Sequence, residues 1–275
     1  MDFHLSDLVP ELQGGSFVGF TNEQLTRYNR HFVLSGIGAV GQRRISQAKV
    51  ALIGAGGLGS VIGYYLCAAG IGKLAIVDND KVELSNLQRQ IAHNMARIDV
   101  NKAESAAQTY RALNPDVDIK VFKERLVKGN IRGLIADYDV VIDGSDNFQT
   151  RFLINDACVL MGKPLVSGAV LGFEGQLMVV MPHDGHCYRC VFEDVPPDGV
   201  VPTCREVGVL GAVPGVIGSL QAMEAIKLIV GNGEVLKGCI LIYNALNVSF
   251  RKVAVQRNPS CKVCGTTPSM SIYDF

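Results

Sequence analysis

The chain has 275 residues, enough for one α/β domain or two small ones and for a substantial apolar core. Lys and Arg together number 26, and so do Asp and Glu, so the formal net charge is zero. This balance argues against a nucleic-acid surface and against a polyanionic substrate.

The N-terminal region, residues 1–20, predicts an irregular arm. It has neither the basic segment nor the apolar run of a secretory signal, so we expect a cytoplasmic protein. Two uncharged runs, 50–72 and 207–223, could be mistaken for membrane spans. Glycines interrupt the first, and glycines with a proline interrupt the second, so we expect neither to cross a membrane.

Two helices are expected before the first strand. Thr21 is a good N-cap for a helix over 22–33, which carries Arg30. A second helix, over 36–47, leads into the apolar segment 50–53, which is typical of a buried parallel strand.

A glycine-rich turn follows this strand. Gly54, Gly56 and Gly59 fit the pattern G-x-G-x-x-G, in which glycines permit a tight turn and let backbone N–H groups approach a phosphate. A helix over 60–69 and a second strand ending at Asp78 complete the unit, and an acidic side chain there can accept hydrogen bonds from ribose hydroxyls. The unit predicts a nucleotide site, although proteins that use NAD, FAD or ATP all share it.

A polar segment, 79–90, follows the second strand at its carboxyl end, where α/β folds place their sites. Arg89 in this segment is a candidate phosphate contact. The next helix, over 102–113, has Lys102 in its first turn, where a cation is unfavourable for the helix dipole. We interpret Lys102 as a second phosphate contact, with a surface lysine as the alternative.

Further segments extend the predicted sheet, with strands at 119–122, 139–143, 163–167 and 175–181 and helices at 130–136 and 148–161. The strand at 175–181 should be antiparallel because the linker before it is too short for a crossover helix. Asp143 and Asp146 lie at the carboxyl end of a central strand, where a carboxylate can hold Mg²⁺ against a triphosphate. Capping of the next helix is the alternative for Asp146.

The C-terminal third begins with a polar loop, 192–201, followed by a helix over 211–230 and a hairpin of strands at 240–243 and 248–255. Together the elements predict an α/β fold. We expect a Rossmann-like, mostly parallel sheet flanked by helices, with antiparallel strands at its C-terminal end.

Two C-x-x-C pairs, Cys187 with Cys190 and Cys261 with Cys264, supply four thiolates, the ligand set of a tetrahedral structural Zn²⁺. In a cytoplasmic protein such pairs favour metal over disulfide. A redox role is the alternative, but neither pair opens a helix after a strand as a redox pair does. Three other cysteines are expected in the core: Cys67, Cys158 and Cys239.

The motifs occur in an order that resembles the ThiF/MoeB/HesA family, bacterial relatives of ubiquitin-activating enzymes. The resemblance covers roughly residues 20–265. The segments that carry it are 27–30 (RYNR), 54–59 (GAGGLG), 85–90 (SNLQRQ), Lys102, Asp146 with Asn147, 214–222 (PGVIGSLQA) and the two cysteine pairs.

This resemblance implies ATP- and Mg²⁺-dependent adenylation of the C-terminal glycine of a small ubiquitin-like sulfur-carrier protein that ends in Gly-Gly. Pyrophosphate leaves, and the carrier serves thiamine thiazole or molybdopterin synthesis. The resemblance places Arg89 and Lys102 on the triphosphate, Asp78 on the ribose and Asp146 on the metal or the reacting phosphate. The full set of implied nucleotide contacts is Gly54, Gly56, Gly57, Asp78, Asp80, Ser85, Asn86, Arg89, Lys102, Asp146 and Asn147.

The resemblance also implies a homodimer in which Arg30 reaches the active site of the partner subunit. Cys204 matches a cysteine that, in the thiazole branch of the family, forms a covalent link to the carrier, and Arg205 beside it could lower its pKa. A surface cysteine without a role is the alternative.

We expect one adenylation domain over residues 21–265, preceded by the arm over 1–20 and followed by a tail over 266–275. The cysteine motif near the end of the chain is not followed by a rhodanese domain, so a separate protein is expected to donate sulfur.

Three other functions remain as alternatives. An NAD-dependent oxidoreductase would explain the glycine turn and Asp78, but not Arg89, Lys102, Asp146 and the cysteines together. An enzyme that adenylates a tRNA nucleoside would need a basic surface, which the neutral charge does not favour. A non-catalytic scaffold that docks a carrier would not need the full set of ATP contacts.

Overall fold

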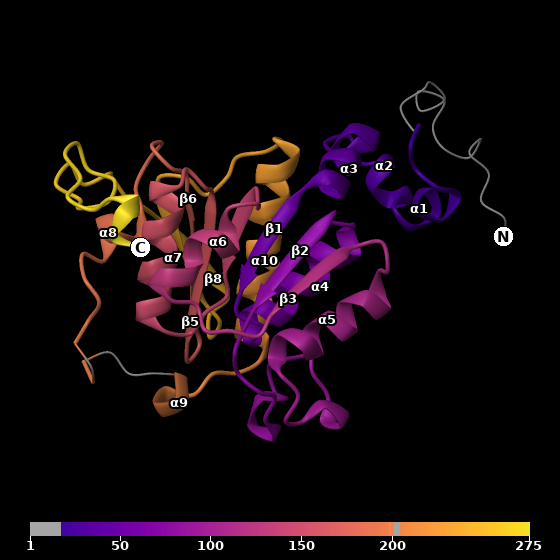
Figure 1. Ribbon diagram of the computed structural model, residues 1–275, viewed down its shortest axis with the longest axis horizontal. Coiled ribbons are helices and arrows are strands. Elements are labelled where there is room, and N and C mark those ends of the chain that lie inside the picture. The colour runs from indigo at the N-terminus through magenta and orange to yellow at the C-terminus, as the bar shows by residue number, and fades with distance from the viewer. Residues whose placement is uncertain (1–17, 198, 201–203) are drawn as a thin grey trace.

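The protein is described from a computed structural model, which covers residues 18–197, 199–200 and 204–275, with only the backbone of Cys204 and Arg205 (Figure 1). Most of the predicted arm therefore lies outside the described residues. One eight-stranded sheet organises the chain, in the order β3-β2-β1-β4-β5-β6-β7-β8. This is the Rossmann-like order, extended at one edge.

The first five strands are parallel, and the last three are antiparallel to their neighbours. Their bounds are β1 Lys49–Ile53, β2 Lys73–Val77, β3 Asp118–Phe122, β4 Val140–Asp143, β5 Leu165–Leu171, β6 Glu174–Val180, β7 Cys239–Asn244 and β8 Ser249–Ala254. The prediction of an antiparallel strand after the short linker is confirmed, because only the two-residue turn between β5 and β6 joins them.

The helices lie on both faces of the sheet. Their bounds are α1 Asn22–Arg27, α2 Asn29–Phe32, α3 Gly38–Gln47, α4 Gly57–Ala69, α5 Lys102–Leu113, α6 Lys128–Ile135, α7 Phe148–Leu160, α8 Tyr188–Val191, α9 Cys204–Val207 and α10 Ala212–Val230. One core cluster joins the sheet to α3, α4, α5 and α10, and a second joins its other face to α6, α7 and the cysteine motifs.

Alternate residues of the central strands belong to these two clusters. In β1, Val50 and Leu52 lie in the first cluster, and Ala51 and Ile53 lie in the second. All four are buried. A strand covered on both faces must be apolar at every position, which explains the uninterrupted apolar run in the sequence.

Two predicted helix boundaries differ from the structure. The expected helix over 22–33 breaks at Tyr28, which is 2% exposed and accepts a hydrogen bond from Asn114 Nδ2. The helix expected from residue 60 begins at Gly57, so two of the glycines read as a turn form the first turn of α4. The first turn of a helix is the part that offers free N–H groups to an anion.

Helix α10 is long and apolar enough to cross a membrane, but half of its apolar window is buried inside the fold. It packs closely on α4, because a Cβ at Gly218 would lie 3.0 Å from the Leu58 carbonyl oxygen. The pattern is that of a core helix in an α/β protein.

Candidate active site and metal site

The loops that follow β1 and β4 meet at the carboxyl edge of the sheet. β2 lies on one side of β1 and β4 on the other, so this is the point at which the chain order reverses, where open α/β sheets bind ligands. Gly54 has a φ of +95°, and a Cβ there would lie 2.8 Å from the Gly144 carbonyl oxygen. Only glycine permits both this conformation and this contact.

The glycine turn leads into α4, whose first N–H groups are suited to an anion. Gly56 is the N-cap, and the first N–H groups of the helix have no partner within it. A Cβ at Gly57 would lie 3.7 Å from Arg89 Cγ and 3.3 Å from Pro214 Cβ. The structure therefore brings Arg89 and the start of α10 to the mouth of the turn, as a phosphate site requires.

Asp78 follows β2 and holds two loops in place. Its carboxylate accepts hydrogen bonds from the backbone N–H groups of Ala55 and Asp80, each at 2.8 Å. Burial raises the pKa of Asp78 above its ordinary value, although the two hydrogen bonds oppose the shift. Asp78 thus orients the glycine turn, in addition to the ribose contact expected of it.

Lys102 is buried at the start of α5, where Asn101 is the N-cap as predicted. Its Nζ lies 3.0 Å from Asp80 Oδ2. The ion pair explains how a cation is tolerated in the first turn of a helix, because the carboxylate offsets the unfavourable dipole. Asp80 is exposed and Lys102 is not, so the surface-lysine alternative for Lys102 does not fit the structure.

Ser85 and Asn86 bond within their own turn. Asn86 Oδ1 accepts from the Glu83 N–H at 3.1 Å, and Ser85 Oγ donates to Glu83 Oε2 at 3.2 Å. Arg89 Nη1 donates to the Ser85 carbonyl oxygen at 3.2 Å. These bonds shape the segment that presents Arg89 to the glycine turn.

The two aspartates after β4 have different environments. Asp143 is fully buried and accepts hydrogen bonds from Ser145, Arg151 and Ser167, which leaves it no role as an open metal ligand. Asp146 is exposed, and among the described residues it has no hydrogen-bond or ion-pair partner. The N-cap of α7 is Asn147, whose side chain accepts from the Thr150 N–H at 2.9 Å, so the capping alternative for Asp146 is wrong.

Arg30 lies away from the other candidate residues. Tyr28, beside it, packs against Gly70 and bonds to Asn114, at the C-terminal ends of α4 and α5. The glycine turn is at the opposite end of α4, which has 13 residues and a length of roughly 20 Å. Figure 1 shows α1 and α2 at the end of the molecule opposite α9. Within one chain, the structure does not bring Arg30 to the site.

Cys204 begins α9, but its side chain lies outside the described part of the chain. Helix α9 lies beside the end of β5, because the Gly172 N–H donates to the Gly208 carbonyl oxygen at 3.1 Å. This is the edge of the sheet that also carries the glycine turn. Of the loop 192–201, residues 198 and 201 are likewise outside the described residues.

The four motif cysteines come together, with all four Sγ atoms within 4.8 Å of one another. The Cys187–Cys261 and Cys190–Cys264 sulfur distances are 3.6 and 3.3 Å. A tetrahedral zinc with bonds of about 2.3 Å would separate its sulfurs by about 3.8 Å. The geometry fits four-thiolate coordination.

Cys187 and Cys190 follow β6, whereas Cys261 and Cys264 follow β8, so a metal here would link the two segments. The hydrogen bond from Cys187 lowers the pKa of Cys264 to about 5. Burial raises the pKa of Cys190, although the Asn258 N–H, which lies 3.3 Å from its Sγ, opposes the shift. Of the other cysteines, Cys67 and Cys158 are fully buried as expected, and Cys239 is half-buried.

The sequence interpretation missed two residues at the glycine turn. His93 Nε2 is 2.9 Å from the Ala55 carbonyl oxygen. Gln90 is buried, its Nε2 would lie 3.7 Å from a Cβ at Gly56, and its Oε1 has no partner among the described residues. Gln90 ends the polar segment 79–90 that carries Arg89, and His93 lies three residues further on, so nearness to this segment was the available signal.

The sequence matches the ThiF family over residues 28–263. A relative from Haloferax volcanii named SAMP-activating enzyme E1 is 47% identical over 252 residues, which are 92% of this chain and 93% of the relative. A sulfur carrier protein adenylyltransferase from Thermus thermophilus is 46% identical, over 91% of this chain and 94% of the relative. A relative from Zea mays, named adenylyltransferase and sulfurtransferase MOCS3-1, is 45% identical over 92% of this chain but only 54% of its own length.

Among solved structures, MccB of E. coli with MccA-N7isoASN has a TM-score of 0.79 over 92% of this chain and 77% of that one. Its sequence is 22% identical, so the likeness concerns the fold alone.

Proposed function

The chain belongs to the ThiF family, and from this premise we propose that it uses ATP to adenylate the C-terminal glycine of a small ubiquitin-like sulfur-carrier protein, with release of pyrophosphate. It is an adenylyltransferase, the activity for which its Thermus thermophilus relative is named. The carrier's carboxylate attacks the α-phosphate of ATP, so the protein need supply only position and charge.

The observation that carries this proposal is the set of groups around the glycine turn. The start of α4 offers backbone N–H groups, and Arg89 and Lys102 offer cations to the triphosphate. Asp146, which is exposed, would hold Mg²⁺, and the ion would supply positive charge to the triphosphate. A dinucleotide oxidoreductase has no need of two cations and a free carboxylate at this point.

ATP–pyrophosphate exchange tests the proposal. We expect exchange that requires Mg²⁺ and a carrier with an intact Gly-Gly terminus, and that is lost when the two glycines are removed from the carrier. Thermal shift with ATP–Mg²⁺ against NAD separates adenylation from hydride transfer. Stabilisation by NAD alone would contradict the proposal.

The carrier could serve thiamine thiazole or molybdopterin synthesis. We propose that a separate protein donates the sulfur, that residues 21–265 act as one adenylation domain, and that the protein works in the cytoplasm. Exchange assays with a carrier from each pathway, and a pull-down with small proteins that end in Gly-Gly, distinguish the two pathways.

We further propose a homodimer in which Arg30 serves the site of the other subunit. The support is its position, since Tyr28 fixes α2 at the end of α4 that is distant from the glycine turn. Arg30 is exposed and has no side-chain partner among the described residues. An exposed guanidinium without a partner in the described part of its own chain can contact the active site of a second subunit.

Mixing Arg30→Ala and Asp146→Ala subunits should restore part of the exchange activity that each variant lacks alone. A mixed dimer has one site with both residues intact, so random exchange should recover roughly a quarter of wild-type activity. Subunit exchange is verified with differently tagged chains. If tagged subunits exchange and no activity returns, Arg30 acts in its own subunit or not at all.

Cys204 is proposed as the nucleophile whose thiolate attacks the carbonyl of the carrier's acyl-adenylate, so that a thioester forms and AMP leaves. The start of α9 lies at the edge of the sheet that carries the glycine turn, which supports access to the carrier terminus. Cys204→Ser should keep pyrophosphate exchange, because adenylation uses the carrier's own carboxylate. It should lose a thiol-sensitive adduct on a non-reducing gel. An adduct that persists in the variant would place the nucleophile elsewhere.

A further inference from the structure

His93 contacts the glycine turn from the segment that joins β2 to α5. Its Nε2 is 2.9 Å from the Ala55 carbonyl oxygen, and its Nδ1 is 2.9 Å from Ser105 Oγ on α5. The side chain is buried. The N–H of Ala55 donates to the Asp78 carboxylate at 2.8 Å, so both polar backbone groups of Ala55 are fixed by buried or half-buried side chains.

These contacts define the tautomer of the imidazole. A carbonyl oxygen can only accept, so Nε2 carries the proton and donates to Ala55, while Nδ1 accepts from the Ser105 hydroxyl. Burial lowers the pKa of His93 to about 4, and the nearby charges of Lys102 and Arg97 act in the same direction. The ring is therefore neutral near pH 7, as this pair of hydrogen bonds requires.

The direction of the Ala55 carbonyl determines the direction of the next N–H. In a trans peptide the C=O and N–H bonds point to opposite sides, so a carbonyl held toward His93 points the Gly56 N–H away from it. Within the described part of the chain, no protein group accepts a hydrogen bond from the Gly56 N–H. Gly56 is the N-cap of α4, so its N–H joins those of the first turn as a donor for an anion.

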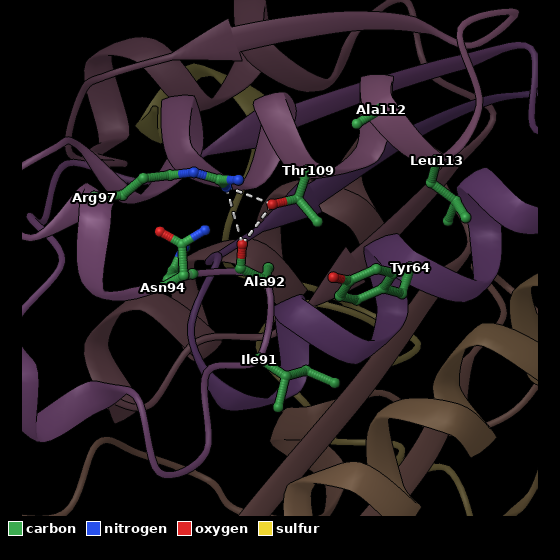
Figure 2. A pocket seen from close by; sticks show the side chains of 9 residues that line it. Tyr64, Ile91, Ala92, Asn94, Arg97, Thr109, Ala112 and Leu113 are labelled. Carbon is green, nitrogen blue, oxygen red and sulfur yellow. Dashed lines mark hydrogen bonds between the residues drawn. The ribbon is translucent and has the colours of Figure 1, made fainter.

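Arg97 and Thr109 hold the segment that carries His93. Thr109 Oγ1 donates to the Ala92 carbonyl oxygen at 2.6 Å, and Arg97 Nη1 donates to the same oxygen at 3.3 Å and to Thr109 Oγ1 (Figure 2). The bonds lie beside a cavity of 490 Å³ between this segment, α4 and α5. Packing contacts are missing where the cavity lies, so these hydrogen bonds attach the segment to α5.

We propose that His93 is a positioning residue for ATP, which holds the Ala55 peptide so that the glycine turn presents its N–H groups to the triphosphate. The inference rests on the proposed function. His93 also joins the three elements that carry the proposed phosphate contacts: the glycine turn, the segment of Arg89 and the helix of Lys102. Because His93 connects these three elements, a shift of one of them changes the positions of the other two.

Calorimetric titration of the full chain with ATP–Mg²⁺ tests this role without the carrier. His93→Leu should weaken ATP binding about tenfold, because the turn loses the donor that orients it. His93→Gln keeps an amide N–H that can reach Ala55, and should bind ATP within about threefold of the wild type. Asn130→Ala, which removes three hydrogen bonds at the start of α6 away from the site, is the matched control and should bind ATP normally.

Exchange kinetics separate this role from a general loss of stability, because a loss of stability would not change the KM for ATP selectively. The KM for ATP should rise in His93→Leu, while the KM for the carrier and the zinc content stay unchanged. If His93→Leu does not fold, Ser105→Ala replaces it, since it removes only the hydroxyl that fixes the tautomer, and a roughly threefold weaker ATP affinity is expected.

Two results would overturn the inference. Wild-type ATP affinity in a folded His93→Leu or Ser105→Ala variant would show that the turn does not depend on His93. Equal losses in His93→Leu and His93→Gln would show that the donor to Ala55 is not the feature that matters. A wild-type protein that binds no ATP would instead overturn the proposed function, and this inference with it.

Discussion

Replacing Asp146 by alanine should abolish carrier-dependent ATP–pyrophosphate exchange, with a loss of roughly a thousandfold, or about 4 kcal/mol of transition-state stabilisation. Asp146 is the exposed carboxylate beside the glycine turn, and among the described residues it has no partner that would occupy it. Its proposed ligand is the Mg²⁺ that neutralises charge at the reacting phosphate. Loss of that anchor affects the chemical step more than the binding of the carrier.

Stability measurements separate this role from a structural one. An exposed side chain without partners can be removed with a change of less than about 0.5 kcal/mol in the free energy of unfolding, so Asp146→Ala should melt like the wild type. Asp184→Ala is the matched control, because Asp184 is an exposed aspartate paired with Lys237 away from the site. Exchange at the wild-type rate in Asp146→Ala would remove the assignment.

The neighbouring carboxylate should behave in the opposite way. Asp143 is buried against Arg151, so Asp143→Ala leaves an unpaired buried cation and should destabilise the fold by about 3–5 kcal/mol. The strand pattern placed Asp143 and Asp146 at the same strand end, and only the family resemblance assigned the metal to Asp146. Their burial distinguishes a structural aspartate from one that is free to bind metal.

Strands and the glycine turn were predictable because their signals are local. A strand covered on both faces is apolar throughout, and a turn in which a Cβ would lie 2.8 Å from another backbone oxygen requires glycine, so both leave a pattern in consecutive residues. The short linker before β6 likewise determined its antiparallel direction. The Cys187 and Cys261 pairs were predictable because thiolate ligands keep a characteristic spacing.

Long-range contacts left no such pattern. The break of the first helix at Tyr28 depends on Asn114, which is 86 residues further along the chain. The Lys102 ion pair depends on Asp80, and the role of His93 depends on Ala55 and Ser105. In each case a polar residue bonds to a partner that is distant in the sequence and lies beside it only in the folded chain.

Zinc should be held tightly by the four motif cysteines, at about one ion per chain. The metal would join the segment after β6 to the segment after β8, and the cysteines lie at the edge of the second core cluster. The Arg257 side chain already holds the second cysteine pair, since its Nε donates to the Cys264 carbonyl oxygen at 2.5 Å. A metal that binds only the folded arrangement adds its binding energy to the stability of the fold.

Cys261→Ser should therefore lose the metal and lower the melting temperature by roughly 10 °C, the shift expected for a loss of about 3–5 kcal/mol in a chain of this size. Cys239→Ser is the matched control, because Cys239 lies in β7 outside the cluster, and it should retain the metal. Elemental analysis and thermal melts check both variants. Wild-type protein that is fully folded and metal-free would contradict the assignment, since four thiols within 4.8 Å of one another would then be held by packing alone.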